Sequence, residues 1–353
     1  MLTSASIKSR ARELSFDLCG IARADRHPKL ARLTEWLDQG RAGDMRYLHE
    51  SRDERLDPAQ VLQSARSVVS LGVVYNTQRR GEETPGHGDS PSLGERGNAE
   101  IARYARGEDY HDVLRARLRA LLEWIAAKVG PGLEAFSCVD NGPVQERVFA
   151  EQAGLGWIGK NTCVINPSIG SWFVLGEILT NLDLEPDAPA VDQCGTCTRC
   201  LDACPTGALT AAYELDATRC LSYLTIETRT PVDAALRPRI AAQVYGCDIC
   251  QDVCPWNRRA AVSDDPAWQP RAGLAAPRLI DLCTMSDDAW RGLIKGSAMR
   301  RAGLRRIRRS LAYATASLDD HQRKVAIAAL AAHSSGQDPD VDEALTWAAS
   351  QDA

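Results

Sequence analysis

The sequence predicts a multidomain α+β protein in which an α/β N-terminal part is followed by a cysteine-rich segment and an all-α C-terminal module. Three observations lead to this prediction. Strand and helix patterns mix through the first half, eight of the twelve cysteines fall between residues 191 and 258, and residues from about 278 onward look helical and are rich in Ala, Leu and Arg. The predicted boundaries are 1–185, 186–262 and 275–353.

Local patterns place the elements of the N-terminal part. The run Ser67–Tyr75 is short, apolar and β-branched, which predicts a buried strand. Asp109 is a candidate N-cap for an amphipathic helix over 110–128. A strand over 134–139 and a turn at Asp140-Asn141-Gly142-Pro143 follow.

Glycines and prolines divide the rest of this half. Residues 76–98 are polar and rich in Gly and Pro, which predicts a long loop. A strand pair is predicted around 162–166 and 171–180, and residues 186–190 look like a linker to the cysteine-rich segment.

The C-terminal residues predict two antiparallel helix pairs, as in helical-repeat proteins. Within them, residues 291–309 read RGLIKGSAMRRAGLRRIRR and contain eight Lys or Arg and no acid. Such a stripe fits a phosphate backbone, although a charge run is more often a solvated helix face.

Composition restricts the class of protein. The chain has 353 residues, a net charge of −5 and 44% hydrophobic residues, as is ordinary for a soluble globular protein. The N-terminal MLTSASIKSRARELSF has no apolar signal segment, and no run of about eighteen apolar residues predicts a membrane span. Twelve cysteines without an export signal indicate thiolate ligands in a reducing cytoplasm.

Cysteine spacing gives the strongest chemical signal. The motifs are Cys194-x2-Cys197-x2-Cys200-x3-Cys204-Pro205 and Cys247-x2-Cys250-x3-Cys254-Pro255, with Cys220 upstream of the second. In two-cluster ferredoxins the last cysteine of each motif ligates the other motif's cluster. We therefore assign two 4Fe–4S clusters as follows: Cys194, Cys197, Cys200 and Cys254 to one, and Cys204, Cys220, Cys247 and Cys250 to the other. A pair of zinc sites is the alternative, but zinc does not explain two C-x2-C-x3-C-P runs.

A pair of clusters transfers single electrons, so the preceding residues are expected to hold an acceptor. They contain no GxGxxG after a strand and no P-loop, which argues against a Rossmann dinucleotide site.

Four further stretches resemble one family. They are RYARGEDYH at 103–111, VDNGPV at 139–144, GLGWIGKN at 154–161 and GSWF at 170–173. Together with the cysteine motifs and Trp256-Asn257, they resemble epoxyqueuosine reductase, the cobalamin-dependent enzyme of the last step of queuosine synthesis in tRNA. The resemblance implies a cobalamin-binding domain over 1–185, a ferredoxin-like domain over 186–262 and a HEAT-like, tRNA-binding module over 275–353.

The resemblance also implies site residues. Asp140 matches the family's proposed proton donor, for which we expect a raised pKa; the alternative is an Asx turn before Gly142. The expected cofactor contacts are Arg103, Tyr104, Asp140, Lys160, Val164 and Thr206. The expected tRNA contacts are Arg147, Arg300, Arg301, Arg305 and Arg306. Solvated or structural roles are the alternative for these side chains.

His111 lies in D-Y-H-D-V-L and not in the D-x-H-x-x-G motif of proteins that ligate cobalt through histidine, so no histidine ligand on cobalt is expected. The implied partners are tRNA carrying epoxyqueuosine, with a GUN anticodon, and a low-potential electron donor. A monomer is expected.

Two other classes compete with this interpretation. A reductive dehalogenase-like enzyme also combines cobalamin with two clusters, but those enzymes usually carry a twin-arginine signal and have no use for a basic helical tail. A plain electron carrier would not need so much chain outside the cysteine-rich segment.

Overall fold

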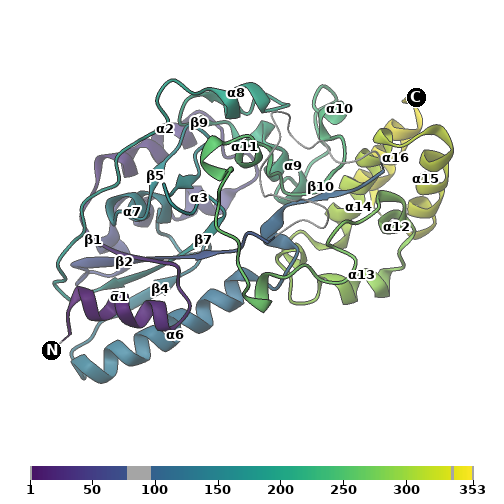
Figure 1. The fold of residues 1–353 in the computed structure, drawn as a ribbon. Coiled ribbons are helices and arrows are strands. Elements are labelled where there is room, and N and C mark those ends of the chain that lie inside the picture. The colour runs from purple at the N-terminus through teal and green to yellow at the C-terminus, as the bar shows by residue number, and fades with distance from the viewer. Residues whose placement is uncertain (1, 78–96, 335–337, 352–353) are drawn as a thin grey trace.

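The structure is a computed structural model that describes residues 2–77, 97–334 and 338–351. Most of the predicted 76–98 loop therefore lies outside the described residues. Figure 1 shows a sheet with flanking helices at the N-terminal end, a helical group at the C-terminal end, and the cysteine-rich segment along one side between them.

A four-stranded sheet organises the N-terminal part. Its strands are β1 (Leu18–Arg23), β2 (Ser67–Val74), β7 (Phe173–Thr180) and β4 (Ala135–Cys138), in the order β1-β2-β7-β4. Every residue of β2 is buried, which confirms the buried strand expected from its apolar run. All three pairings are antiparallel, so this part is α+β, and the predicted α/β arrangement was wrong.

Helices cover both faces of this sheet. Helices α1 (Ser4–Glu13) and α6 (Tyr110–Val129) pack on one face, with Ile7 and Leu118 in the shared core. Helix α7 (Glu146–Gln152) packs on the other through Phe149. Asp109 accepts a hydrogen bond from the His111 backbone N–H, which confirms the predicted N-cap of α6.

Short elements fill the remaining connections. They are α2 (Arg32–Asp38), α3 (Arg46–Glu50), α4 (Arg52–Leu56), α5 (Pro58–Val61), β5 (Trp157–Ile158) and β6 (Val164–Ile165). Both strands predicted at 162–166 and 171–180 are present, as β6 and β7, but β6 pairs with β5 and not with β7, so their pairing with each other was wrong. An Asn166–Gly170 bridge turns the chain between β6 and β7, and β7 enters the central sheet instead.

The cysteine-rich segment joins the N-terminal part through a strand. Its elements are α8 (Arg199–Ala203), β8 (Leu209–Ala211), β9 (Glu214–Leu215), α9 (Leu221–Ile226), α10 (Arg237–Ile240), β10 (Gln243–Tyr245) and α11 (Ile249–Asp252). Strand β10 pairs in parallel with β3 (Glu100–Ile101), just before the first residue of the predicted site. One apolar core contains residues of β3, β10 and the C-terminal helices, so the three predicted segments are packed together.

The C-terminal residues are helical, as predicted. The helices are α12 (Leu279–Thr284), α13 (Asp287–Ile294), α14 (Gly303–Ala314), α15 (Asp320–Ser334) and α16 (Pro339–Ala349), and the short 3-10 helix η6 (Ala298–Arg301) precedes α14. Helix α14 packs against α16, and α12 packs against α15. Their HEAT-like character stays a prediction. In the part of the chain that the structure describes, no helix has the length and apolarity needed to cross a bilayer.

One arginine of the basic stretch attaches this module to the cysteine-rich segment. Arg309 is only 1% exposed and donates to the carbonyl oxygens of Leu224, Thr228 and Thr230 at 2.9, 3.2 and 3.1 Å. These carbonyls follow or end α9, so the guanidinium satisfies acceptors that the helix cannot. Arg309 is therefore a structural residue and not a surface charge.

We predict that Arg309→Met destabilises the protein by about 3 kcal/mol, because three acceptors lose a charged donor in a buried site. Arg305→Met is the matched control on the same helix: its half-exposed guanidinium pairs with Asp338 and Asp340, which is worth no more than about 1 kcal/mol. Urea unfolding followed by circular dichroism measures both. Equal losses would contradict the assigned role of Arg309.

Candidate active site and cysteine-rich segment

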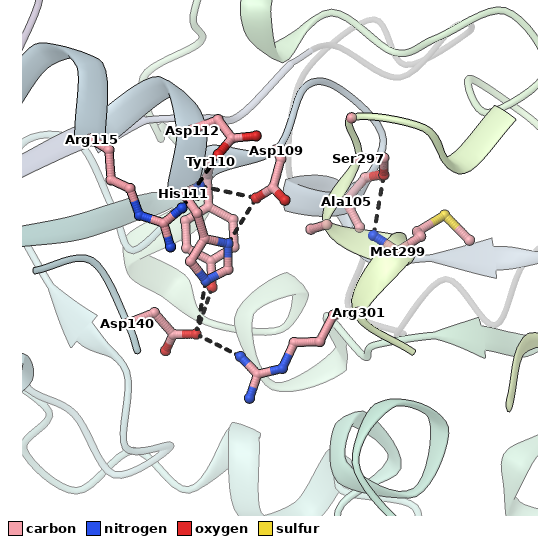
Figure 2. A network of polar contacts seen from close by, with 12 residues as sticks. Ala105, Asp109, Tyr110, His111, Asp112, Arg115, Asp140, Ser297, Met299 and Arg301 are labelled. Carbon is pink, nitrogen blue, oxygen red and sulfur yellow. Dashed lines mark hydrogen bonds and ion pairs between the residues drawn. The ribbon is translucent and has the colours of Figure 1, made fainter. Parts of the chain in front are cut away.

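Asp140 lies in the turn that follows β4. Its φ of 58° is left-handed, a conformation that Asp adopts more readily than most residues. Its backbone N–H donates to Glu146 Oε1 at 2.7 Å, at the start of α7. The chain bends at 140–143, as predicted. The Asp140 side chain bonds to residues of α6 and η6, and in the part of the chain that the structure describes no hydrogen bond joins it to the Gly142 backbone as in an Asx turn (Figure 2).

Three donors from two separate segments converge on one oxygen of Asp140. The Tyr110 hydroxyl donates to Oδ2 at 2.8 Å, and His111 Nε2 and Arg301 Nη1 each lie 3.4 Å from it. Figure 2 shows the imidazole of His111 and the guanidinium of Arg301 on different sides of the carboxylate. Because these groups come from α6 and η6, only the folded chain assembles them.

The expected raised pKa of Asp140 was wrong. Burial opposes ionisation, but hydrogen bonds from His111 and Tyr110 and the charges of His111 and Arg301 outweigh it and lower the pKa to about 2. Although 48% of the side chain is accessible, burial is still the largest single influence on this pKa. Asp140 is thus an ionised carboxylate, enclosed by protein but reachable by solvent.

His111 is held between two carboxylates. Nδ1 lies 2.7 Å from Asp109 Oδ1, and Nε2 faces Asp140. Burial disfavours the charged ring, yet the bonds to Asp109 and Asp140 outweigh that effect and raise the pKa of His111 to about 9. The ring is therefore an imidazolium at neutral pH.

Two further ionisable groups border Asp140. Burial, and then the charge of Asp140, raise the pKa of Glu146 to about 8. Burial and the same charge raise the pKa of Tyr110 far above its usual range, so the phenol keeps the proton that it donates.

The basic C-terminal stretch does not form one charged surface. Arg301 pairs with Glu227 at 2.8 Å, lies 5.9 Å from the ring of Tyr47 and reaches Asp140. Arg300 is exposed, and Arg306 donates to its own helix at Ala302 O. Arg305 is exposed and pairs with Asp338 and Asp340. Arg308 and Arg309 are buried: Arg308 pairs with Asp287, and Arg309 binds three carbonyl oxygens. Arg301, an expected tRNA contact, lies beside Asp140 and is still exposed, so its contact with RNA stays a prediction.

A layer of aromatic rings connects Asp140 to the cysteine-rich segment. The ring of Tyr104 lies 5.8 Å from Tyr110, 6.4 Å from Tyr75 and 6.3 Å from Tyr245, centroid to centroid. Tyr245 ends β10, two residues before Cys247. The acidic site and the second cysteine set are therefore separated by little more than this layer.

The other expected cofactor contacts are mostly buried. Arg103 is stacked over Trp172 at 4.4 Å and bonds to Asn76 and Asp252, so its guanidinium is already engaged. Val164 lies buried in β6, and Thr206 lies buried with its hydroxyl 3.7 Å from Cys204 Sγ.

Lys160 and Arg147 contact neighbouring loops. Lys160 Nζ donates to Gly195 O at 2.6 Å and to Cys197 O at 2.9 Å, so it braces the first cysteine loop. Arg147 donates to Thr162 O at 2.8 Å, in a loop where Thr162 has a left-handed φ of 65°. Contacts of either residue with cofactor or RNA stay a prediction.

The structure brings the eight predicted cysteines together in the two expected sets. Burial and then the charges of Cys194 and Cys200 raise the pKa of Cys254 to about 11, so the last cysteine of motif two lies beside motif one. Likewise, Cys204 and Cys220 both act on the pKa of Cys247. The described residues contain no group of three or more His, Cys, Asp or Glu side chains that is arranged around a single metal ion. A cube separates its four thiolates because each binds a different iron atom.

Two neighbours of these sets were missed from sequence. Trp157 Nε1 donates to Cys194 Sγ at 3.5 Å. Cys163 lies beside Cys250, and this contact lowers the pKa of Cys163 and raises that of Cys250. Cys163 has no motif spacing to reveal it. Among the residues around Asp140, Tyr110 and His111 lie within the RYARGEDYH stretch, so their place in the family pattern was the available signal.

Eight thiols in ferredoxin order, next to an accessible carboxylate with a charged histidine, define an iron–sulfur oxidoreductase with an acid–base site. A family model described as "4Fe-4S double cluster binding domain" matches residues 193–257, which favours 4Fe–4S clusters over zinc. A second model, "Epoxyqueuosine reductase QueG, DUF1730", matches residues 55–141 and ends just past Asp140.

Whole-chain comparisons agree. The epoxyqueuosine reductase of Gloeobacter violaceus is 46% identical over 87% of this chain and 95% of its own length. That of Salmonella typhimurium is 37% identical over 98% of this chain and 87% of its own. This chain belongs to the epoxyqueuosine reductase family and is an oxidoreductase.

Solved structures of the family share the fold. A crystal structure of epoxyqueuosine reductase with an epoxyqueuosine-modified tRNA-Tyr stem loop aligns with a TM-score of 0.86 at 31% identity, over 98% of this chain and 88% of that one. The structure of the Streptococcus thermophilus enzyme aligns with a TM-score of 0.84 at 31% identity, over 99% and 90%.

We predict that Trp157→Phe lowers the reduction potential of the cluster at Cys194 by tens of millivolts, because a hydrogen bond to a cluster sulfur stabilises the reduced state. Trp256→Phe is the matched control, since that indole packs edge-on against Trp157 at 5.0 Å. A redox titration followed by electron paramagnetic resonance measures both. An unchanged potential in Trp157→Phe would show that this bond does not tune the cluster.

Proposed function

We propose that this chain reduces epoxyqueuosine to queuosine at the wobble position of tRNA, with electrons passed from two 4Fe–4S clusters to cobalamin. The observation that carries the proposal is the accessible Asp140 carboxylate, bound by Tyr110 and His111, only an aromatic layer away from the second cysteine set. Family membership supplies the substrate, because the relatives are named for it and one was crystallised with it.

The cysteine ligation follows the ferredoxin exchange rule. Residues 186–262 form the cluster domain, with Cys194, Cys197, Cys200 and Cys254 on one cube and Cys204, Cys220, Cys247 and Cys250 on the other. Cys194, Cys197 and Cys200 lie in a largely exposed loop, whereas Cys247 of the second set follows Tyr245 of the aromatic layer by two residues. Electrons from a low-potential donor would therefore enter at the first cube and leave from the second.

Residues 1–185 suit a corrin ring. Tyr104 presents a partly accessible ring in the aromatic layer, which offers a flat apolar surface close to Asp140. Both nitrogens of His111 already face carboxylates, which leaves that histidine engaged away from a cobalt atom. We therefore assign Tyr104, Val164, Thr206 and the loop around Thr162 to the side that would hold cobalamin.

Bound cobalamin supplies the reduced cobalt that delivers electrons to the epoxide carbon. Residues of the chain itself protonate the epoxide oxygen. Opening of the epoxide produces an alkoxide, and Asp140 is placed to deliver a proton to it, while Tyr110 and Arg301 fix the orientation of the carboxylate. Since Asp140 is ionised before the reaction, its proton must come from a neighbour.

The C-terminal module, residues 275–353, is the proposed tRNA surface. Arg300 is exposed at the tip of η6, one residue before Arg301 enters the Asp140 site. A base turned out of the anticodon loop would thus meet the acid–base site while its backbone meets η6. As an enzyme that acts on tRNA, the chain is expected to work as a monomer in the cytoplasm.

Anaerobic reconstitution with iron, sulfide and cobalamin, followed by incubation with epoxyqueuosine tRNA and a strong reductant, tests the function. Nucleoside mass spectrometry should report loss of one oxygen and formation of queuosine. Protein that takes up both clusters and cobalamin but leaves the epoxide intact would overturn the proposal.

We predict that Asp140→Asn slows epoxide reduction by about 10²–10⁴-fold while cobalamin and tRNA still bind, because the amide cannot relay a proton. Asn also tolerates the left-handed φ of this position. Asp112→Asn, at an exposed position of α6, is the matched control. Single-turnover rates measure both variants, and full activity of Asp140→Asn would reject its role.

We predict that Arg300→Gln weakens tRNA binding and reduces the slope of log K against log salt by about 1, because one phosphate contact is lost. Arg305→Gln should change the slope less, since Asp338 and Asp340 already neutralise that guanidinium. Binding titrations at several salt concentrations decide between them. Equal slopes for Arg300→Gln and the unmodified protein would place the RNA elsewhere.

A further inference from the structure

The proposed function removes an epoxide oxygen as water, and this reaction consumes two protons. The inference below rests on that function. One C–O bond breaks to give an alkoxide, which takes the first proton. The second C–O bond breaks when the resulting hydroxyl takes the second proton and departs as water. The two electrons supplied to the substrate then form the C=C double bond. The clusters account for the electrons. A single carboxyl stores one proton at a time, and Asp140 is ionised before the reaction begins.

The immediate neighbour of Asp140 is built to hold a proton. His111 is 11% exposed in its side chain, and each ring nitrogen faces a carboxylate oxygen. Because a carboxylate only accepts hydrogen bonds, both ring nitrogens must carry hydrogen to satisfy the two partners, which is the imidazolium form. Asp109 Oδ1 also accepts the His111 backbone N–H at 3.0 Å, so the same carboxylate fixes the main chain and the ring.

The charges around the ring favour this form. The carboxylates of Asp109 and Asp140 face the imidazole directly, and Tyr110 stacks on it at 4.0 Å with its proton retained. The nearby cation Arg301, on η6, contacts the carboxylate of Asp140. Arg115, further along α6, acts on the carboxyl of Asp109.

Glu146 is the other group near Asp140 that keeps a proton close to neutral pH. Its Oε1 binds the backbone N–H of Asp140, whereas His111 faces the side-chain oxygen that also binds Tyr110 and Arg301. A proton from Glu146 would have no direct path to the reacting oxygen. The short route therefore begins at His111.

We propose that His111 is the proton store of the reaction, passing its Nε2 proton to Asp140 once for each C–O bond that breaks. Asp109 retains the hydrogen on Nδ1, so Nε2 is the nitrogen that loses and regains a proton. Between the two steps neutral His111 takes a proton from solvent at Nε2. His111 acts through Asp140 and is a positioning residue, whereas Asp140 is the catalytic residue that reaches the substrate.

Three substitutions separate proton storage from structural support. His111→Gln keeps an N–H donor but holds no transferable proton. Asp109→Asn keeps the N-cap of α6, because Asn caps as well as Asp, but removes one of the two carboxylates from the ring. His321→Gln, at an exposed position of α15, is the matched control.

The first measurement is an NMR titration of the imidazoles in the full chain, without a substrate. The chain has six histidines, and the signal missing from His111→Gln identifies His111. We expect it to titrate near pH 9, and to move toward the ordinary value of about 6.5 in Asp109→Asn and Asp140→Asn. A midpoint near 6.5 in the unmodified protein would overturn the proposal.

The second measurement is the single-turnover rate of the reduced, loaded enzyme between pH 6 and pH 10. Raising the pH through about 9 removes the stored proton, so the unmodified rate should fall there. In Asp109→Asn the fall should begin at lower pH. His111→Gln should be about 10²-fold slower, and its rate should not fall near pH 9. His321→Gln should match the unmodified enzyme.

The outcomes distinguish this inference from the proposed function. Active unmodified enzyme together with a His111→Gln variant of unchanged rate and pH profile overturns proton storage alone. Loaded, unmodified enzyme that never consumes the epoxide overturns the function, and the relay with it, whatever the NMR titration gives. If His111→Gln does not fold, the shifted pH limb of Asp109→Asn still decides the question.

Discussion

The ion pair between the Asp140 carboxylate and the His111 imidazolium is the interaction on which the active-site arrangement depends. It fixes the turn after β4 against the first turn of α6, and it sets the charge of both groups. Burial alone would neutralise the carboxyl and the imidazole. Because each supplies the other's counter-charge, both stay ionised in an enclosed site. Arg301 then attaches η6 of the C-terminal module to the same carboxylate.

This arrangement connects RNA binding, proton delivery and electron delivery over a short distance. Arg300 and Arg301 are consecutive and both exposed, and Arg301 also reaches the acid–base site. On the opposite side, Tyr104 lies between Tyr110, which binds Asp140, and Tyr245, which precedes Cys247. The parallel pairing of β3 with β10 puts Tyr245 opposite Ile101, three residues before Tyr104. A small shift of either strand would alter both proton delivery and electron delivery.

Buried arginines hold distant segments of the chain together. Arg309 fills the end of α9, and Arg103 is fixed over Trp172 by Asn76 and Asp252. Both belong to stretches that sequence reasoning assigned to ligands. A buried guanidinium has five N–H donors, and nearby carbonyl, amide and carboxylate oxygens of the fold bind the terminal NH2 groups of both arginines, although the Nε of each has no partner. Charge content along the sequence is therefore a poor guide to which arginines remain available for RNA.

The sequence by itself determined the features that depend on neighbours along the chain. Cysteine spacing gave the two sets, the Asp109 N-cap gave the start of α6, and the apolar run gave the buried strand β2, because each reflects local geometry or local burial. Only the tertiary structure decided the antiparallel sheet, the pairing of β6, the ionised state of Asp140 and the separate roles of Arg300, Arg301 and Arg309. Most of those properties depend on groups that are tens to more than a hundred residues apart in sequence, from 30 between Tyr110 and Asp140 to 161 between Asp140 and Arg301. A pKa or an ion pair is set by what lies within a few ångströms in space.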